Sequence, residues 1–177
     1  MIHVRPGRPE DAVEIGRVHV ASWRRAYVGI VSEANLAALD PIERAGIWER
    51  AITQGEGSIP GKTLVATVGT DPGAPIAGFA FHGPSRQGGP ETGELVAIYA
   101  HPDQWGTGAG RALFERCVAE QREAGQSEMI LWVLSTNAQA RGFYEAMGMV
   151  ADGSVQPYQP RGPEPQALEI ARFRMDL

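Results

Sequence analysis

The chain has 177 residues, of which 43% are hydrophobic and 21% charged, and its formal net charge at pH 7 is −5. These proportions are those of an ordinary globular protein and exclude the disordered and fibrous classes. The length indicates one domain, residues 1–177, with a core large enough to fold without disulfides or metals. The acidic balance gives no basic footprint for duplex nucleic acid. It fits either cationic partners or a charge that serves solubility.

The first third of the chain predicts one short strand followed by helices. Residues 2–5 form the strand, and Pro9 suits the first position of a helix whose first turn is acidic. Apolar residues between positions 15 and 26 recur at helical spacing. A second helical region covers residues 33–51, with a break near Asp40 because a proline follows it.

From residue 62 the pattern alternates between strands and helices. The expected strands are residues 62–68, 76–82, 94–100, 129–134, a sixth bracketed by Val150 and Val155, and 167–175. The expected helices are residues 108–124, ended by Gly125, and one that Asn137 opens and Gly148 ends. Residues 156–165 contain four prolines and are expected to be a loop. This order predicts an α/β or α+β protein with a mixed sheet.

The cysteine content, the histidine spacing and the hydropathy indicate the compartment of the protein and whether it binds a metal. Cys117 is the single cysteine, which excludes an internal disulfide and fits a reducing compartment. The four histidines show no spacing typical of metal ligands. The N-terminal residues have no apolar signal-peptide core, and no stretch approaches the ~20 apolar residues of a membrane span. We therefore expect a soluble, cytoplasmic protein without a metal.

The turn before the helix at 108–124 is rich in glycine. Gly106, Gly108 and Gly110 alternate with other residues, so the backbone can turn tightly and an anion can approach it closely. The first N–H groups of a helix are unpaired and, with the helix dipole, form a phosphate site. A glycine-rich turn without a ligand is the alternative that this segment alone leaves open.

Two other phosphate-binding loops do not fit this turn. A P-loop requires a Lys after its last glycine, and none follows here. A dinucleotide fingerprint has the spacing Gly-x-Gly-x-x-Gly, and counted from Gly106 its third glycine would fall at Arg111. The spacing Gly-x-Gly-x-Gly therefore belongs to a different turn.

Two segments, in this order, resemble the GNAT superfamily of N-acetyltransferases. Residues 94–103 and 105–113 resemble its central motif, which ends in Gln/Arg-x-x-Gly-x-Gly/Ala, with Gly108 and Gly110 at the two small positions. Residues 137–149 resemble its second signature, Asn-x-x-Ala-x-x-Phe-Tyr-x-x-x-Gly-Phe, one helix and one strand downstream. Trp105 stands where the family has Gln or Arg, a position that contributes mainly through its main-chain N–H.

The resemblance implies a fold, a co-substrate and a set of site residues. The fold is a GNAT-like mixed, mostly antiparallel sheet of six to seven strands flanked by about four helices. The co-substrate is acetyl-CoA, used without a metal, and its acetyl group passes by direct attack in a ternary complex. The residues implied in binding it are Ile98, Tyr99, Ala100, Trp105, Gly106, Thr107, Gly108, Ala109, Gly110, Arg111, Asn137 and Tyr144.

Each group of these residues has an implied task. Main-chain N–H groups of residues 106–111 hold the pyrophosphate. The strand end at residues 98–100 pairs with the pantetheine amides as one strand pairs with another, and its N–H polarises the thioester carbonyl. Asn137 helps to position pantetheine, and Tyr144 donates a proton to the departing thiolate.

The acceptor amine must also lose a proton, since a free alkylammonium has a pKa of roughly 10. Glu94 is the candidate base, directly or through water, because it lies eleven residues before the Gln/Arg position, where histone acetyltransferases of the family carry theirs. A solvent-facing carboxylate, or one that binds a cationic substrate, is the alternative. For Tyr144 and for Tyr27, a candidate acceptor contact, the alternative is core packing. Cys117 lies on a packed helical stripe and is expected in the core rather than as an acyl-enzyme nucleophile.

The expected activity is N-acetylation of an unidentified small-molecule or peptide amine. The segments that would select it, residues 27–32, 83–89 and 156–165, carry no motif, so polyamines, aminoglycoside-like drugs and protein N-termini stay open. No nucleic-acid or membrane partner is expected, and the sequence leaves open a homodimer, which is common in the family. An acyl-CoA-sensing domain and a nucleotide-binding enzyme are the rival interpretations. Glu94 and Tyr144 argue against the first, and the glycine spacing argues against the second.

Overall fold

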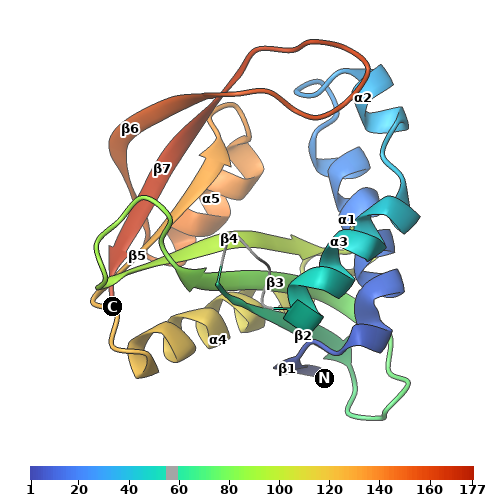
Figure 1. The fold of residues 1–177 in the computed structure, drawn as a ribbon, viewed down its shortest axis with the longest axis vertical. Helices are drawn as coiled ribbons and strands as arrows, with labels where there is room; N and C mark the ends of the chain where they lie inside the picture. Colours follow the sequence, from blue (N-terminus) through green and yellow to red (C-terminus); the bar gives the residue numbers. More distant parts are fainter. Residues whose placement is uncertain (55–59) are drawn as a thin grey trace.

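The computed structural model describes residues 1–54 and 60–177, and seven strands within them form one mixed sheet (Figure 1). The strands are β1 (Ile2–Pro6), β2 (Lys62–Val68), β3 (Ile76–Pro84), β4 (Thr92–Ala100), β5 (Glu128–Leu134), β6 (Val150–Tyr158) and β7 (Leu168–Asp176). The helices are α1 (Ala12–Ala26), α2 (Glu33–Ala37), α3 (Pro41–Gln54), α4 (Ala109–Glu123) and α5 (Ala138–Ala146). The sheet order is β1-β2-β3-β4-β5-β7-β6, and only the β4–β5 pair is parallel. The predicted mixed, mostly antiparallel sheet is therefore confirmed.

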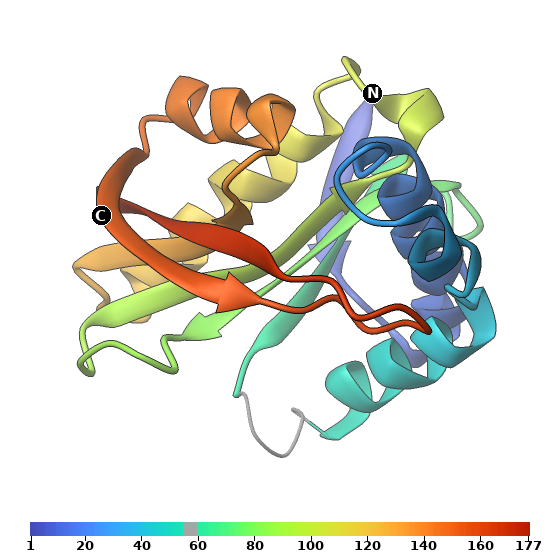
Figure 2. The same ribbon diagram turned by 90° about the horizontal axis from the view of Figure 1, so that it is seen from above.

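The helices cover both faces of the sheet (Figure 2). Side chains alternate between the faces along each strand, so Leu64 and Ala66 pack with α4 whereas Val65 packs with α1 and α3. The face that carries α1 and α3 is called the α1 face below, and the opposite one the α4 face. On the α1 face, a Cβ at Gly16 would lie 2.3 Å from the carbonyl oxygen of Pro41, so glycine permits the close approach of α1 to α3.

Residues 156–165 are not all loop as predicted. Strand β6 continues to Tyr158 and pairs with β7, and its register is interrupted between Ala151 and Val155. Pro157 is tolerated because β6 is an edge strand, where a missing N–H breaks no ladder on the open side. Proline content therefore misled the prediction at this strand end.

Strands β4 and β5 separate soon after they begin to pair. Their ladder contains only Thr92, Gly93 and Glu94 against residues 128–130. Immediately afterwards β4 carries an extra residue, Val96, between two residues that pair with consecutive positions on β3. Such a bulge bends the strand and increases its twist. The second half of β4 thus has a free edge where a neighbouring strand would otherwise lie.

In the part of the chain that the structure describes, we find no helix with the length and apolar character needed to cross a membrane.

Candidate active site

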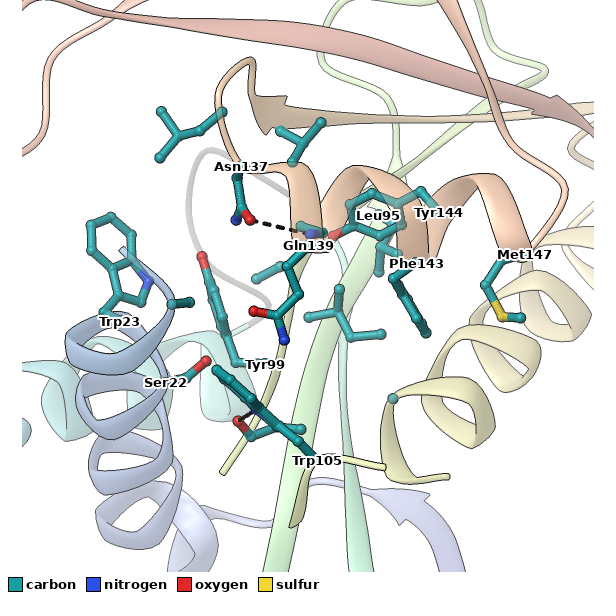
Figure 3. A pocket seen from close by; sticks show the side chains of 18 of the residues that line it. Ser22, Trp23, Leu95, Tyr99, Trp105, Asn137, Gln139, Phe143, Tyr144 and Met147 are labelled. Carbon is teal, nitrogen blue, oxygen red and sulfur yellow. Dashed lines mark hydrogen bonds between the residues drawn. The ribbon is translucent and has the colours of Figure 1, made fainter. Parts of the chain in front are cut away.

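A cleft of about 610 Å³ opens where β4 and β5 separate (Figure 3). Its walls come from the second half of β4, the glycine turn, the ends of α1 and β5, helix α5, and strands β6 and β7. Of the residues predicted to form the site, those that line the cleft are Tyr27, Ile98, Tyr99, Ala100, Trp105, Gly106, Gly108, Ala109, Gly110, Arg111, Asn137 and Tyr144. Glu94 and Thr107 do not line it.

The glycine turn leaves a set of donors exposed to the cleft. Gly106 and Gly108 have φ angles of 78° and 93°, in the left-handed region that favours glycine. An added Cβ would have no atom within 4 Å at either position, so the space beside the turn is open. Among the described residues, no protein acceptor receives a hydrogen bond from the N–H groups of Gly106 and residues 108–111. These free donors at the start of α4 fit a diphosphate.

Two residues of this turn have donors that are already paired. The N–H of Thr107 donates to the carbonyl oxygen of Gln104, at 3.3 Å, and is therefore not one of the free donors. The indole N–H of Trp105 donates to the carbonyl oxygen of Ala100, at 3.0 Å. The residue in the Gln/Arg position thus closes the turn onto the end of β4, a contact that the sequence did not predict.

Helix α5 begins at the cleft with Asn137. The carboxamide oxygen of Asn137 accepts a hydrogen bond from the N–H of Ala140, at 3.1 Å, which caps the helix (Figure 3). This bond occupies the oxygen, so the part of the buried side chain that is available to a ligand is the amino group, which donates hydrogen bonds.

Tyr144 lies about two helical turns after Asn137, and its ring contacts those of Phe143 and Phe173. It is 9% exposed and lines the cleft. Burial, and more weakly the nearby Tyr99, raise the pKa of Tyr144 far above its usual value of 10. The phenol is therefore protonated at neutral pH and can donate a proton but not accept one.

Glu94 lies at the point where β4 and β5 separate, and it is 2% exposed. Its carboxylate accepts three hydrogen bonds from Arg86: from the backbone N–H at 3.2 Å, from Nε at 3.2 Å and from a terminal nitrogen at 2.6 Å. Arg86 comes from the loop after β3, lines the cleft, and has a side chain that is 45% exposed. Glu94 itself does not line the cleft, but its ion-pair partner Arg86 does.

The two faces of the sheet supply different ends of the cleft. Leu95, Ile98 and Tyr144 belong to the core on the α4 face, together with the helix that follows the glycine turn. Tyr99 packs on the α1 face, and Trp23 and Tyr27 pack in a third cluster with the end of β5. The main chain of Tyr99 is thus on the free edge of β4, while its ring points away from the glycine turn.

Several lining residues were not identified from the sequence. They are Arg86, Trp132, Gln139, Phe143, Met147, Tyr158 and Ile170. Arg86 and Tyr158 fall in segments expected to select the acceptor, but a single arginine or tyrosine there carries no spacing signal. Trp132 follows the apolar pattern of a buried strand, which predicts core packing as well as a site.

Comparisons with known proteins identify the class that this fold and cleft define. The model of the acetyltransferase (GNAT) family matches residues 40–149. The chain is 32% identical over 177 residues to the uncharacterized N-acetyltransferase YuaI of Bacillus subtilis, covering 99% of this chain and 89% of that protein. It is 28% identical over 160 residues to the probable N-acetyltransferase Rv2775 of Mycobacterium tuberculosis, covering 90% and 86%. The chain therefore belongs to the acetyltransferase (GNAT) family.

Solved structures agree with the fold. The PaiA N-acetyltransferase of Thermoplasma acidophilum, in complex with coenzyme A, superposes with a TM-score of 0.78 at 17% identity, covering 100% of this chain and 99% of that one. The yncA protein of Salmonella typhimurium, solved with acetyl-CoA, gives 0.68 at 21% identity, covering 100% and 94%. At these identities the likeness concerns the fold alone.

Proposed function

We propose that this protein transfers the acetyl group of acetyl-CoA to an amine. The observation that carries the proposal is the cleft itself, in which the free edge of β4 leads directly into a turn with unpaired N–H groups. A diphosphate fits the turn, and an extended amide chain fits a free strand edge. Membership of the acetyltransferase (GNAT) family, and neighbours solved with coenzyme A or acetyl-CoA, support it.

Acetyl-CoA supplies the activated thioester, and the chain supplies binding and orientation. The N–H groups of Gly106 and residues 108–111 bind the diphosphate, and Asn137 donates to the pantetheine arm. Residues 98–100 pair with that arm along the free edge of β4. A main-chain N–H there is placed to polarise the thioester carbonyl, because a donor fixed at the developing oxyanion lowers the barrier to attack.

Tyr144 is proposed as the proton donor to the leaving thiolate. Its phenol is protonated at the pH of the reaction, lines the cleft, and lies on the α4 face with the residues that lead into the glycine turn. A donor held in the cleft stabilises the departing sulfur, as general acids do.

Glu94 is proposed as the general base, acting through water. Its carboxylate is buried next to the cleft, and the hydrogen bonds to it found in residues 1–54 and 60–177 all come from Arg86. Since the side chain of Arg86 is 45% exposed, its guanidinium can release one carboxylate oxygen to a water that contacts the amine. An E94Q enzyme that keeps its rate across pH would remove Glu94 from the mechanism.

The test combines binding and turnover. Isothermal titration calorimetry measures the affinity for coenzyme A, which the glycine turn is proposed to bind. Thiol release from acetyl-CoA over a panel of amines measures acetyl transfer. We expect micromolar binding and release that depends on the added amine. Absence of binding to any coenzyme A species contradicts the proposal, whereas binding without turnover on any amine indicates a sensing domain instead.

A further inference from the structure

We propose that the acceptor is a small amine with a single positive charge and a flat aromatic body, bound on the α1 face of the cleft. This inference rests on the proposed acetyl transfer and specifies its substrate class. Three independent features carry it: the aromatic lining, the charge of the lining, and a fixed loop that directly follows the lining residue Tyr158.

Aromatic rings from four elements line the cleft on the α1 face. They are Trp23 near the end of α1, Tyr27 just beyond it, Tyr99 on β4, Trp132 on β5 and Tyr158 on β6. The rings of Trp23 and Tyr27 meet edge to face at 4.7 Å. Figure 3 shows Trp23 and Tyr99 facing the cavity from opposite elements. Rings that present both faces and edges favour a flat apolar ligand.

The ring of Tyr99 is held rigidly from behind. His19 stacks on it, with ring centroids 4.9 Å apart and 15° between the planes. The Nδ1 atom of His19 accepts a hydrogen bond from the indole of Trp48, at 3.0 Å, which fixes the plane of the imidazole. A wall fixed in this way can select a ligand by shape, because its side chains do not reorder on binding.

The lining offers no counter-charge for a polycation. Among the described residues that line the cleft, none is Asp or Glu, and the charged ones are Arg86 and Arg111. Burial raises the pKa values of Tyr27, Tyr99 and Tyr158, so these phenols stay neutral.

A second ammonium group buried here would have no partner and would be strongly destabilised. A single amine, in contrast, is attracted to the aromatic faces while it is charged. It then loses its proton more easily as the uncharged aromatic side chains desolvate it, which direct attack requires. Polyamines and aminoglycosides are therefore disfavoured.

The loop that follows Tyr158 is fixed against the N-terminal part of the chain. Residues 159–167 connect β6 to β7 and reach across to α2 (Figures 1 and 2). Asn35, which is 1% exposed, exchanges two hydrogen bonds with the backbone of Glu164, both at 2.9 Å. Gln166 accepts from the N–H of Ser32 at 2.9 Å and donates to the carbonyl oxygen of Ile30 at 2.7 Å. This latched loop leaves less room for a folded protein than an open groove would.

The test compares three amines that differ in aromatic character and in the number of positive charges. Saturation-transfer NMR and calorimetry on the full chain, with and without coenzyme A, measure binding of 2-phenylethylamine, n-butylamine and spermidine. The same amines are then assayed for acetyl transfer. We expect 2-phenylethylamine to bind about tenfold more tightly than n-butylamine, because the ring contacts are lost in the latter, and spermidine to bind most weakly.

The outcomes separate this inference from the proposed function. Acetyl transfer that favours spermidine, or equal binding of n-butylamine, overturns the aromatic acceptor while leaving the acetyltransferase in place. If the protein does not bind coenzyme A, the proposed acetyl transfer is wrong. Amine binding measured without coenzyme A would then still test the aromatic lining.

A variant pair locates the binding site. Tyr158→Ala should weaken 2-phenylethylamine about fivefold, whereas Val155→Ala, on the same strand but 56% exposed, should leave binding unchanged. Thermal melts check that both variants fold. Equal binding by the two folded variants would place the amine elsewhere, and the comparison of probes on the unmodified protein stands without either variant.

Discussion

The two ends of the cleft present different kinds of chemical groups to a ligand. At the cofactor end, the groups that meet a ligand belong to the backbone: the N–H groups of residues 106 and 108–111 and the free edge of β4. At the acceptor end, the groups are side chains, among them Trp23, Tyr27 and Tyr158, brought together from distant parts of the chain.

This difference decides which substitutions each end tolerates. A backbone site depends on conformation, so it is damaged by residues that cannot adopt the required dihedral angles and is indifferent to most others. A side-chain site depends on the identity of each residue, so truncation removes the contact itself. One fold can therefore keep the same co-substrate while the acceptor changes.

Tyr144→Phe should give the largest effect, because Tyr144 is the proposed proton donor and its side chain lines the cleft. Loss of a general acid lowers turnover by about 100-fold or more, while the ring still packs against Phe173 and acetyl-CoA affinity changes little. Steady-state kinetics and calorimetry with coenzyme A measure the two quantities. Unchanged turnover would assign Tyr144 to packing alone.

Gly108→Ala tests the backbone end. A Cβ at a φ of 93° is strained and occupies the open space beside the turn. We expect coenzyme A affinity to fall by about 30-fold, since two or more hydrogen bonds to a charged group are disturbed. Calorimetry measures the loss.

The matched control for this glycine is Gly125→Ala. Gly125 has a φ of 84°, follows α4 and has open space beside it, but lies at the other end of the helix. The control carries the same backbone strain and should bind coenzyme A normally. A similar loss in both variants would show that strain, rather than the diphosphate site, is responsible.

The same difference explains how far the sequence could be interpreted. The glycine turn, the capping Asn137 and the order of strands were predictable, because backbone conformation restricts residue type locally. The break at Asp40 and the helix from residue 109 follow from the same rule. The acceptor wall was not predictable in this way, apart from Tyr27, because Trp132 and Tyr158 come from separate strands that only the tertiary fold brings to one cleft.

The partner of Glu94 was unpredictable for a related reason. Arg86 lies in a loop rich in Gly and Pro, eight residues earlier, and nothing in that spacing indicates a contact. The prolines after residue 155 predict a loop, whereas β6 extends to Tyr158 because an edge strand accommodates Pro157. Pairing between strands, not local propensity, determined both outcomes.

Arg86→Ala asks whether the acceptor end also contributes to stability. Removing the guanidinium takes away the counter-charge and two side-chain hydrogen bonds of the buried Glu94 carboxylate but keeps the bond from the backbone N–H of residue 86, and the loss is destabilising. Because Arg86 is partly exposed, we expect a loss of about 1–2 kcal/mol in the free energy of unfolding, measured in urea. The double variant with Glu94→Gln should recover part of it.

The control for this ion pair is Arg17→Ala. Arg17 pairs with Glu14 on the exposed side of α1, with side chains 65% and 44% exposed. Exposed pairs contribute little, so the change should stay below about 0.5 kcal/mol. Equal losses from the two arginines would mean that water reaches Glu94 freely, and would weaken the argument that Glu94 is a protected base.

The last effect appears only at low pH and concerns the wall behind Tyr99, through the titration of His19. Burial, and then the nearby charge of Arg44, lower the pKa of His19 to about 3. Unfolded histidine titrates near 6.5, so between these values the unfolded chain binds a proton that the folded chain does not. The contribution of His19 to the free energy of unfolding is therefore fully present above pH 6.5. It falls as the pH drops, by up to about 1.4 kcal/mol per pH unit.

Urea unfolding between pH 4 and 6 measures that slope, and His19→Gln should make it shallower by about one proton. His3→Gln, on the exposed side of β1, should leave the slope as it is. His82 is also buried and its pKa is lowered in the same direction, so part of the slope persists in His19→Gln. A slope identical to that of the unmodified protein would mean that the imidazole takes up its proton in the folded state. The plane of Tyr99 would then not be fixed by a neutral ring, and the acceptor wall would lose the rigidity that distinguishes it from an ordinary apolar surface.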